Sequence, residues 1–448
     1  MKTYKIGIIG CGNIAKKMAL TLGGMKHVER YAVASRSKEK AETFAGEWQF
    51  TKAYGSYEEL IKDPHVDLIY IATPHSEHYE HARLCILNQK PVLCEKAFTA
   101  NARQAEELLN LAKEHQVFIT EAIWTRYMPL SQKIRELIEQ GAIGKPYTLS
   151  ANLGYVIQDK ERIIRPELAG GALLDIGVYT LNFAAMTFGT DIEDMSSACR
   201  KTETGVDGQE NITLFYKDGK MASLQASIYA QTDRMGVISG DKGHLIVENI
   251  NNPQSVRLVD SNYNITAVYH APAQITGYEY EVYAAIEALE NGWLESPYMP
   301  HAETIRIMKQ MDELRKSWEL FIRVTKKGIG TEHSVPILYF FSDFLEQISS
   351  RYLPGVLSQI RSRNIFAHFI RNQFCQFACT DVVVYSNLQV AQQFHTDTDI
   401  HTDSTSLCIH QLIKAIVNVK AKLRTGCQVY TQGASQTNRP FQVNGNFN

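Results

Sequence analysis

A glycine-rich turn near the amino terminus constrains this chain more than any other feature of its sequence. Residues 10–15 read Gly-Cys-Gly-Asn-Ile-Ala and directly follow the apolar segment 4–9. Between a strand and a helix, Gly10 allows a tight turn, Gly12 lets the backbone approach a pyrophosphate, and Ala15 lets the helix pack closely on the strand. The exposed amides at the start of that helix favour an anion. The pattern predicts a dinucleotide site, against the alternative that the glycines merely connect strand and helix.

The first part of the chain alternates between strand-like and helix-like segments. We expect strands at 4–9, 31–35, 66–72, 91–94 and 117–120, and helices at about 13–23, 38–45, 77–88 and 101–115. Strands that alternate with helices of this length form a parallel sheet with right-handed crossovers. Because the strands are apolar throughout, both faces of the sheet are expected to be covered. Residues 1–125 are therefore predicted to form a Rossmann domain that binds NAD(P).

Residues 126–330 follow a different pattern, in which strand succeeds strand. We expect strands at 147–153, 209–216, 220–229, 235–240, 244–248, 255–259 and 265–269, and helices at about 278–290 and 301–318. Short turns such as Lys-Asp-Gly-Lys at 217–220 indicate hairpins. The predicted fold class is thus an α/β Rossmann domain plus an α+β domain with an open, mostly antiparallel sheet. The uncovered face of such a sheet is the expected surface of a homodimer.

The end of the second strand indicates which dinucleotide is bound. A site specific for NAD has Asp or Glu there to accept from the ribose hydroxyls. This chain has Ser35 and Arg36 at that place, with Lys38 and Lys40 close behind. A guanidinium suits a 2′-phosphate, and a carboxylate would repel it. We therefore expect NADP, with the alternative that Arg36 is only solvated and that NAD is accepted as well.

Two distant segments supply the candidate reacting group. Lys96 follows the short strand expected at 91–94, and the carboxyl ends of parallel strands face the ligand crevice. Asp175 and Tyr179 lie four residues apart and would share one face of a helix. A lysine ammonium lowers the pKa of a neighbouring phenol, which makes Tyr179 a candidate general acid/base. Taken alone, Asp175 is better explained as a helix N-cap and Tyr179 as a packed interface residue.

Together these segments resemble the glucose–fructose oxidoreductase/inositol dehydrogenase (Gfo/Idh/MocA) family over about residues 1–325. The resemblance is carried by GCGNIA at 10–15, EKA at 95–97 and GGALLDIGVY at 170–179, with support from 71–79 and 121–127. The pattern is most similar to the dimeric dihydrodiol dehydrogenase and NADP-dependent D-xylose dehydrogenase branch. The family usually has proline after the motif lysine. Ala97 replaces it here, which leaves the turn after Lys96 freer.

The resemblance implies roles for individual residues. Lys96 corresponds to the motif lysine, Tyr179 to the acid/base tyrosine and Asp175 to their polar partner. The residues expected at the cofactor are Gly10, Gly12, Asn13, Ile14, Ser35, Arg36, Thr73, Pro74, His78, Glu95 and Lys96. Those expected at the substrate are Trp124 and Arg126 together with Asp175 and Tyr179.

The implied activity is an NADP-dependent oxidoreductase that moves hydride between the nicotinamide and a carbinol carbon of a sugar, polyol or cyclic dihydrodiol. In the oxidation, Tyr179 takes the hydroxyl proton while Lys96 stabilises the phenolate and the developing alkoxide. Asp175 orients the substrate or Lys96, and Trp124 forms an apolar wall. The alternative is a non-catalytic NADP-binding sensor or regulator on the same fold.

Composition narrows the class of protein further. A net charge of −2 and a pI of about 6.7 give no basic field for nucleic acid. No apolar run reaches the roughly 18 residues that a membrane span needs. Eight cysteines are too sparse for a disulfide framework, and no His/Cys/carboxylate set has the spacing of a metal site. We therefore expect a cytoplasmic protein with a small-molecule substrate and no metal.

Residues 331–448 differ from the preceding chain. They hold few charged residues and many glutamines, and their apolar runs have neither helical nor strand period. No part of this segment has a counterpart in the family. It is either an extra domain or an appended, out-of-frame segment with no selected fold, and its composition favours the second interpretation.

Overall fold

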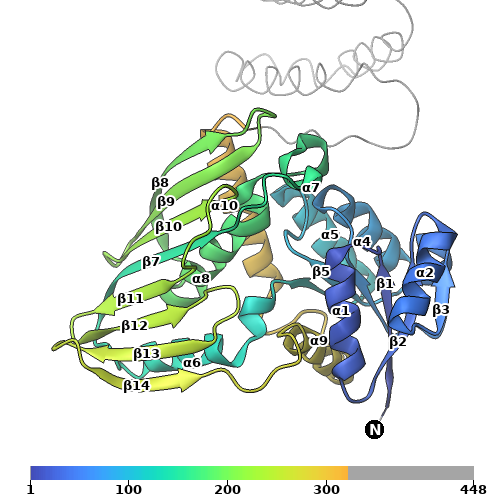
Figure 1. The fold of residues 1–448 in the computed structure, drawn as a ribbon, viewed down its shortest axis with the longest axis horizontal. Helices are drawn as coiled ribbons and strands as arrows, with labels where there is room; N and C mark the ends of the chain where they lie inside the picture. The colour runs from blue at the N-terminus through green and yellow to red at the C-terminus, as the bar shows by residue number, and fades with distance from the viewer. Residues whose placement is uncertain (1, 321–448) are drawn as a thin grey trace, which may run out of the picture. The chain divides into compact units, whose positions relative to one another are not determined.

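The computed structural model describes residues 2–320, and its first part is a six-stranded parallel sheet (Figure 1). The spatial order of the strands is β3-β2-β1-β4-β5-β6. These are β1 (Tyr4–Ile9), β2 (Val28–Ala34), β3 (Lys52–Tyr54), β4 (Leu68–Ile71), β5 (Val92–Glu95) and β6 (Ile119–Ala122). The order turns back between β1 and β4, and in such sheets ligands bind at the carboxyl ends of the strands on either side of that point.

Helices connect these strands as the crossovers that the sequence predicts. They are α1 (Asn13–Gly24), α2 (Lys38–Trp48), α3 (Tyr57–Ile61), α4 (His78–Leu87) and α5 (Ala102–His115). All residues of β4, β5 and β6 are buried, which confirms that both sheet faces are covered. Only β3 and α3 were not expected. β3 is a three-residue edge strand and α3 a single short turn, so neither is long enough to show a hydrophobic period.

The second part is an eight-stranded sheet in the order β14-β13-β12-β11-β7-β10-β9-β8. Its strands are β7 (Pro146–Gly154), β8 (Ile192–Lys201), β9 (Asp207–Tyr216), β10 (Met221–Ser227), β11 (Gly236–Gly240), β12 (Gly243–Glu248), β13 (Ser255–Asp260) and β14 (Ile265–His270). Every pair is antiparallel except β7 with β10. The predicted fold class, a Rossmann domain plus a mostly antiparallel open sheet, is confirmed.

One face of this sheet is packed and the other is open. Along β9 the side chains of Ile212, Leu214 and Tyr216 are buried, whereas Asn211 is exposed. Figure 1 shows α8 and α10 lying along the packed face. The helices of this part are α6 (Pro129–Glu139), α7 (Glu161–Ile164), α8 (Val178–Phe188), α9 (Glu279–Asn291) and α10 (His301–Ser317).

Three elements of this second part were not expected from the sequence: β8, α6 and the four-residue helix α7. β8 is an edge strand that pairs only with β9, and its largely polar residues alternate without an apolar face. α6 is amphipathic and begins at Pro129, a residue well suited to the first turn of a helix.

A glycine pair leads the chain into the helix predicted to carry the reacting side chains. A Cβ on Gly170 would collide with the carbonyl oxygen of Ile163, so the two backbone segments touch directly. Gly171 has a φ of +122°, a conformation that favours glycine, and lies against the carboxylate of Asp207 on β9. The glycines are therefore required by close approaches that any side chain would block.

The helix after this pair begins as a π-helical turn. The turn, η4 (Leu173–Gly177), runs directly into α8, so the expected helix is present but starts before Asp175. The stretch Pro166–Phe188 is long and apolar enough to cross a membrane, yet 83% of its window is buried inside the protein. It is the core helix that supports the packed face of the sheet.

Replacing Gly170 with Ala tests the close approach of the two segments. We expect a loss of stability of about 1–3 kcal/mol, because the methyl group forces the Ile163 carbonyl away. Urea denaturation measures it. The control is Gly46→Ala in α2, where the added Cβ has no neighbour within 4 Å and alanine favours the helix. Equal denaturation midpoints for wild type and Gly170→Ala would contradict the prediction.

Candidate active site

Lys96 and Asp175 meet where the two sheets join. Lys96 directly follows β5, and its Nζ donates to the backbone oxygen of Asp175 at 2.5 Å and to its Oδ1 at 3.2 Å. The side chains are 13% and 6% exposed, so the pair is largely shielded from water. This contact joins residues 79 positions apart, one directly after β5 and one in η4, and agrees with the polar partnership that the resemblance implied for Asp175.

Arg162 and His75 surround the same carboxylate. Arg162 Nη1 lies 2.7 Å from Asp175 Oδ1, and His75 Nε2 lies 4.0 Å from it. Burial by itself would raise the pKa of Asp175, but the charges of Lys96 and Arg162 hold that pKa well below its ordinary value. Burial lowers the pKa of His75 to about 3, so this imidazole is neutral. Asp175 is thus an ion-pair partner and not the N-cap that was the alternative.

Tyr179 completes the cluster. The Nζ of Lys96 lies 5.1 Å from the centroid of its ring, so the ammonium faces the phenol as expected. Burial, followed by the proximity of Tyr278 and Glu95, raises the pKa of Tyr179 well above 10. The expectation that Lys96 lowers the pKa of Tyr179 is wrong, because burial of the phenol and the neighbouring acids dominate its environment. Tyr179 is therefore a protonated phenol at neutral pH.

Two buried acids, Glu95 and Glu281, lie close to each other beside the reacting group, and of these only Glu281 was not singled out from the sequence. Glu95 accepts from the hydroxyl of Tyr70 on β4 and from the Lys96 amide, and burial raises its pKa to about 7. Glu281 on α9 is fully buried, and neither of its oxygens has a partner in the described residues. Burial and Glu95 raise its pKa well above the ordinary value. The observed hydrogen-bond partners of Glu95 are thus groups of the protein itself, and its expected contact with the cofactor stays a prediction.

His78 ties together the turns after β4 and β5. Its ring is fully buried, with Nδ1 2.9 Å from the oxygen of Ala97 and Nε2 2.8 Å from the oxygen of Thr73. Pro74 follows Thr73 and precedes the 3-10 turn η1 (His75–Glu77). His78 therefore holds the backbone of Thr73 and Ala97 in place at the sheet edge where the cofactor is expected.

The turn after Lys96 is held more firmly than Ala97 alone suggests. The peptide bond between Lys96 and Ala97 is cis, and Ala97 is fully buried. Its carbonyl is bound by His78, and the preceding ammonium is bound by Asp175. Neighbouring side chains thus replace the constraint that a proline ring would supply.

Trp124 and Arg126 come from the 3-10 turn η2 (Trp124–Tyr127) after β6 but have different surroundings. Trp124 stacks on Tyr278 with ring centroids 4.2 Å apart, which makes an aromatic wall on the side of Tyr179. Arg126 donates from Nε to Asn182 at 2.6 Å and pairs through Nη2 with Glu303 at 2.9 Å. These contacts link η2 to α8 and α10, and the expected substrate contact of Arg126 stays a prediction.

The glycine turn has the form that a pyrophosphate needs. Gly10 has a φ of +106°, and a Cβ there would approach the Ala72 oxygen at 2.8 Å. A Cβ on Gly12 would meet no atom within 4 Å, so the open side of the turn is at this residue. Helix α1 starts at Asn13 and Ile14 with no side-chain cap and no acidic residue in its first turn. The amides of its first turn are therefore free to bind an anion. The residues of this turn thus fit the pyrophosphate of a dinucleotide.

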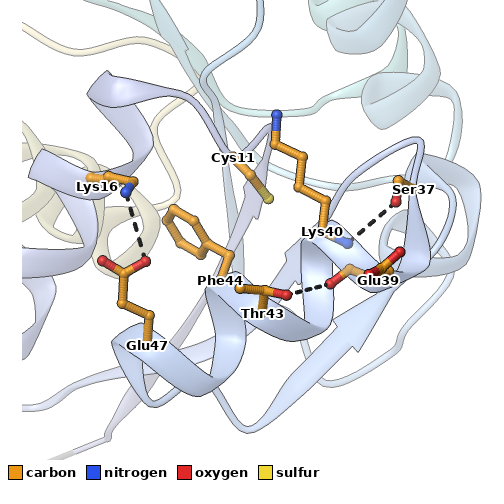
Figure 2. Close-up of a pocket in the computed structure, with 8 residues that line it drawn as sticks. All are labelled: Cys11, Lys16, Ser37, Glu39, Lys40, Thr43, Phe44 and Glu47. Carbon is orange, nitrogen blue, oxygen red and sulfur yellow. Dashed lines mark hydrogen bonds and ion pairs between the residues drawn. The ribbon is translucent and has the colours of Figure 1, made fainter.

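The pocket beside this turn lies between α1 and α2 (Figure 2). Its lining residues are Cys11, Lys16, Ser37, Glu39, Lys40, Thr43, Phe44 and Glu47. In Figure 2 the side chain of Lys40 extends from α2 toward Cys11. Lys38 instead donates to the oxygen of Ala53 at 2.6 Å and pairs with Glu42. Of the two lysines weighed at the sequence level, the structure brings only Lys40 to the pocket.

Ser35 and Arg36 lie at the end of β2, at the rim of the same region. Ser35 is buried, and its hydroxyl accepts from the amide of Ser37 at 3.4 Å. Arg36 is exposed. A buried hydroxyl beside an exposed guanidinium suits a phosphate at the pocket mouth.

Within residues 2–320, no group of histidine, cysteine, aspartate and glutamate side chains is arranged to hold a metal ion. His75 and His78 are engaged with the carbonyls of Ala169, Ala97 and Thr73. The two interpretations of residues 331–448 concern a segment that lies outside the described residues.

Two family models match the chain in succession. Residues 4–122 match the "Oxidoreductase family, NAD-binding Rossmann fold" model, named GFO_IDH_MocA. Residues 131–246 match the "GFO/IDH/MocA C-terminal domain". The two matches follow the order of the parallel and the antiparallel sheets.

Curated relatives match the same part of the chain. A trans-1,2-dihydrobenzene-1,2-diol dehydrogenase from Xenopus tropicalis is 36% identical over 318 residues, which is 69% of this chain and 96% of the relative. The Homo sapiens enzyme of the same name is 34% identical over 319 residues, with the same shares of both chains.

Solved structures share the fold. KijD10, a 3-ketoreductase from Actinomadura kijaniata in complex with NADP and TDP-benzene, has a TM-score of 0.64 and 24% identity over 70% of this chain and 98% of its own. The aldose-aldose oxidoreductase from Caulobacter crescentus complexed with glycerol has a TM-score of 0.64 and 19% identity over 71% and 98%.

Asp175→Asn removes the anion between Lys96 and Arg162, and we expect a loss of about 3 kcal/mol at neutral pH. Because the folded pKa of Asp175 lies below that of an unfolded aspartate, this contribution is complete above about pH 5 and is lost as the pH falls further. Urea denaturation of both proteins from pH 7 downward measures it. A stability difference that stays constant or grows in acid would refute the assignment.

Proposed function

The chain belongs to the Gfo/Idh/MocA family of oxidoreductases, and we propose that it is an NADP-dependent dehydrogenase acting on a carbinol carbon of a sugar, polyol or cyclic dihydrodiol. The observation that carries this proposal is the Lys96 ammonium held between the Asp175 carboxylate and the Tyr179 ring. This arrangement lies at the edge of the Rossmann sheet where a nicotinamide would bind. A sensor that only binds the dinucleotide has no need of these three side chains together.

The substrate class is supported by the relatives. Those at 34–37% identity are dehydrogenases of a cyclic diol. Structures of the same fold include a ketoreductase bound to NADP and an aldose-aldose oxidoreductase. These names describe oxidation or reduction of a diol, a ketone or an aldose. Such reactions move a proton to or from a substrate oxygen, and an ammonium and a phenol can assist that transfer.

The protein's part in the reaction is the movement of one proton. Bound NADP supplies the hydride donor or acceptor at its nicotinamide ring. Tyr179 is a neutral phenol, so in reduction it donates its proton to the carbonyl oxygen of the substrate. Lys96 lies beside that phenol and stabilises both the phenolate and the alkoxide-like oxygen. Trp124 and Tyr278 exclude water from one side.

Oxidation runs through the same groups in reverse. Tyr179 must then be a phenolate before the substrate hydroxyl can give up its proton. Because burial raises the pKa of Tyr179, this form becomes more abundant as the pH rises. The raised pKa of Tyr179 therefore supports proton donation at neutral pH and proton acceptance only at more alkaline pH.

The preference for NADP rests on the cations around the pocket of Figure 2. Lys40 lines this pocket, and Arg36 is exposed and precedes the lining residue Ser37 in the chain, whereas β2 ends without a carboxylate. A 2′-phosphate would form charge-assisted hydrogen bonds to both cations.

The open face of the second sheet supports a homodimer. It exposes small polar side chains such as Ser223 and Gln225 and the apolar Met221 along β10. Sedimentation of the purified protein measures the assembly. The cytoplasmic location stays a prediction.

Lys96→Met and Tyr179→Phe test the reacting group. We expect each to lower turnover by about 10²–10⁴-fold while NADPH binding persists, since each removes a proton-handling or charge-stabilising group. NADPH absorbance is followed with a panel of aldoses, inositols and trans-dihydrodiols.

The matched controls are Lys145→Met and Tyr147→Phe. This second lysine also faces a tyrosine ring, 5.2 Å from its centroid, but Tyr147 is exposed on the sheet. Normal turnover in both active-site variants would disprove the assignment.

Arg36→Ala and Lys40→Met test the choice of cofactor. We expect each to raise the dissociation constant of NADPH by about tenfold and to leave that of NADH unchanged, because only NADPH carries the 2′-phosphate. Fluorescence titration measures both constants. Lys38→Met is the control, since this lysine binds Ala53 and Glu42. An equal loss for both dinucleotides would argue against a phosphate contact.

A further inference from the structure

Arg162 also contacts the reacting group, from a chain segment other than the one that carries Lys96. It lies on α7, between β7 and the glycine pair that leads into η4. Its side chain is 47% exposed, whereas the Asp175 side chain that it binds is 6% exposed. The Arg162 side chain is therefore partly in solvent while its guanidinium binds a buried carboxylate. Neither the sequence motifs nor the comparisons give this residue a role.

Arg162 and Lys96 share one acceptor atom. Asp175 Oδ1 lies 2.7 Å from Arg162 Nη1 and 3.2 Å from Lys96 Nζ, while Arg162 Nη2 lies 3.5 Å from Oδ2. The forked guanidinium thus sets the rotation of the carboxylate. That rotation fixes where Oδ1 holds the ammonium, and the ammonium faces the ring of Tyr179.

The backbone around Arg162 is itself firmly held. The amide of Gly171 donates to the oxygen of Ile163 at 2.8 Å, and Thr204 donates to the oxygen of Ile164 at 2.5 Å. His75, from the Rossmann part, lies 3.1 Å from the oxygen of Ala169. Ile163 is buried between these contacts. The position of Arg162 is therefore built into the fold, unlike that of an ordinary surface arginine.

We propose that Arg162 is a positioning residue of the reacting group: by orienting the Asp175 carboxylate, it holds the Lys96 ammonium against Tyr179. The proposal rests on the proposed dehydrogenase function. Arg162 acts through Asp175 and does not itself handle the proton. Its loss should lower the rate of the chemical step and leave dinucleotide binding intact, because small misplacements of a reacting group cost rate.

The same segment offers a matched control. Arg165 lies three residues further along and is exposed to nearly the same extent, at 45%. Its partners are Glu161 and Glu167, which are also exposed. Arg165→Met therefore removes an equivalent charge and an ion pair from this segment without touching Asp175.

The experiment compares Arg162→Met, Arg162→Lys, Arg165→Met, Asp175→Asn and the double variant of Arg162→Met with Asp175→Asn. We expect Arg162→Met to lower kcat by about tenfold to a hundredfold, and the lysine variant and Arg165→Met to stay closer to wild type. In the Asp175→Asn background the loss of Arg162 should cost less than about twofold, since its target is gone. Guanidinium ion at non-denaturing concentration should restore part of the activity of Arg162→Met.

Three results would overturn the proposal. They are an equal loss of kcat in the Asp175→Asn background, a rise in the substrate KM with kcat unchanged, and equal effects of Arg162→Met and Arg165→Met. The second result would mean that Arg162 binds the substrate directly.

Melting temperatures of the same proteins without cofactor separate this proposal from the proposed function. If Arg162 and Asp175 interact, Arg162→Met lowers the melting temperature less in the Asp175→Asn background than in wild type. Additive shifts would show that the contact is absent, even in an active enzyme. If the wild-type protein turned over none of the panel substrates, the proposed dehydrogenase function would be refuted. Non-additive melting shifts would then still support the contact between Arg162 and Asp175.

Discussion

The site depends on a buried ion pair that joins the parallel sheet to the helix packed on the antiparallel sheet. Lys96 extends from the carboxyl edge of the parallel sheet, and Asp175 lies in the helix that packs against the antiparallel sheet. Neither charge can be buried alone without a cost of several kcal/mol. The pair therefore fixes the layers relative to each other, and Tyr179 four residues later comes to lie beside the ammonium.

Close backbone contacts let this pair form. Gly170 touches the carbonyl of Ile163, and Gly171 takes a positive φ beside Asp207. Asp207 in turn accepts the amide of Leu173 at 2.5 Å, at the first residue of η4. A larger residue at either glycine would move the whole turn and would carry Asp175 away from Lys96.

Buried acids make the surroundings of the pair unusual. Lys96 and Arg162 both lower the pKa of Glu95, but its burial outweighs them and raises that pKa to about 7. Glu281 has no hydrogen-bond partner within the described residues, and burial and Glu95 raise its pKa. Tyr179 is a neutral phenol, so the negative charge of Asp175 is balanced by the cations Lys96 and Arg162. Forming a phenolate at this buried site costs free energy, and the neighbouring Lys96 ammonium lowers that cost.

Short stretches of sequence were sufficient to predict the features that depend on local geometry. The glycine turn, the apolar parallel strands and the alternation along β9 each have a period or a conformational requirement that can be seen in a few consecutive residues. The resemblance of the motifs then identified Lys96, Asp175 and Tyr179 as one group. Tertiary structure alone decided what depends on distance between remote segments: the Arg162 contact, the inward placement of Lys40 over Lys38, and the protonation of Tyr179. Charge, burial and contact at these positions come from chain segments far away in sequence, which no local pattern records.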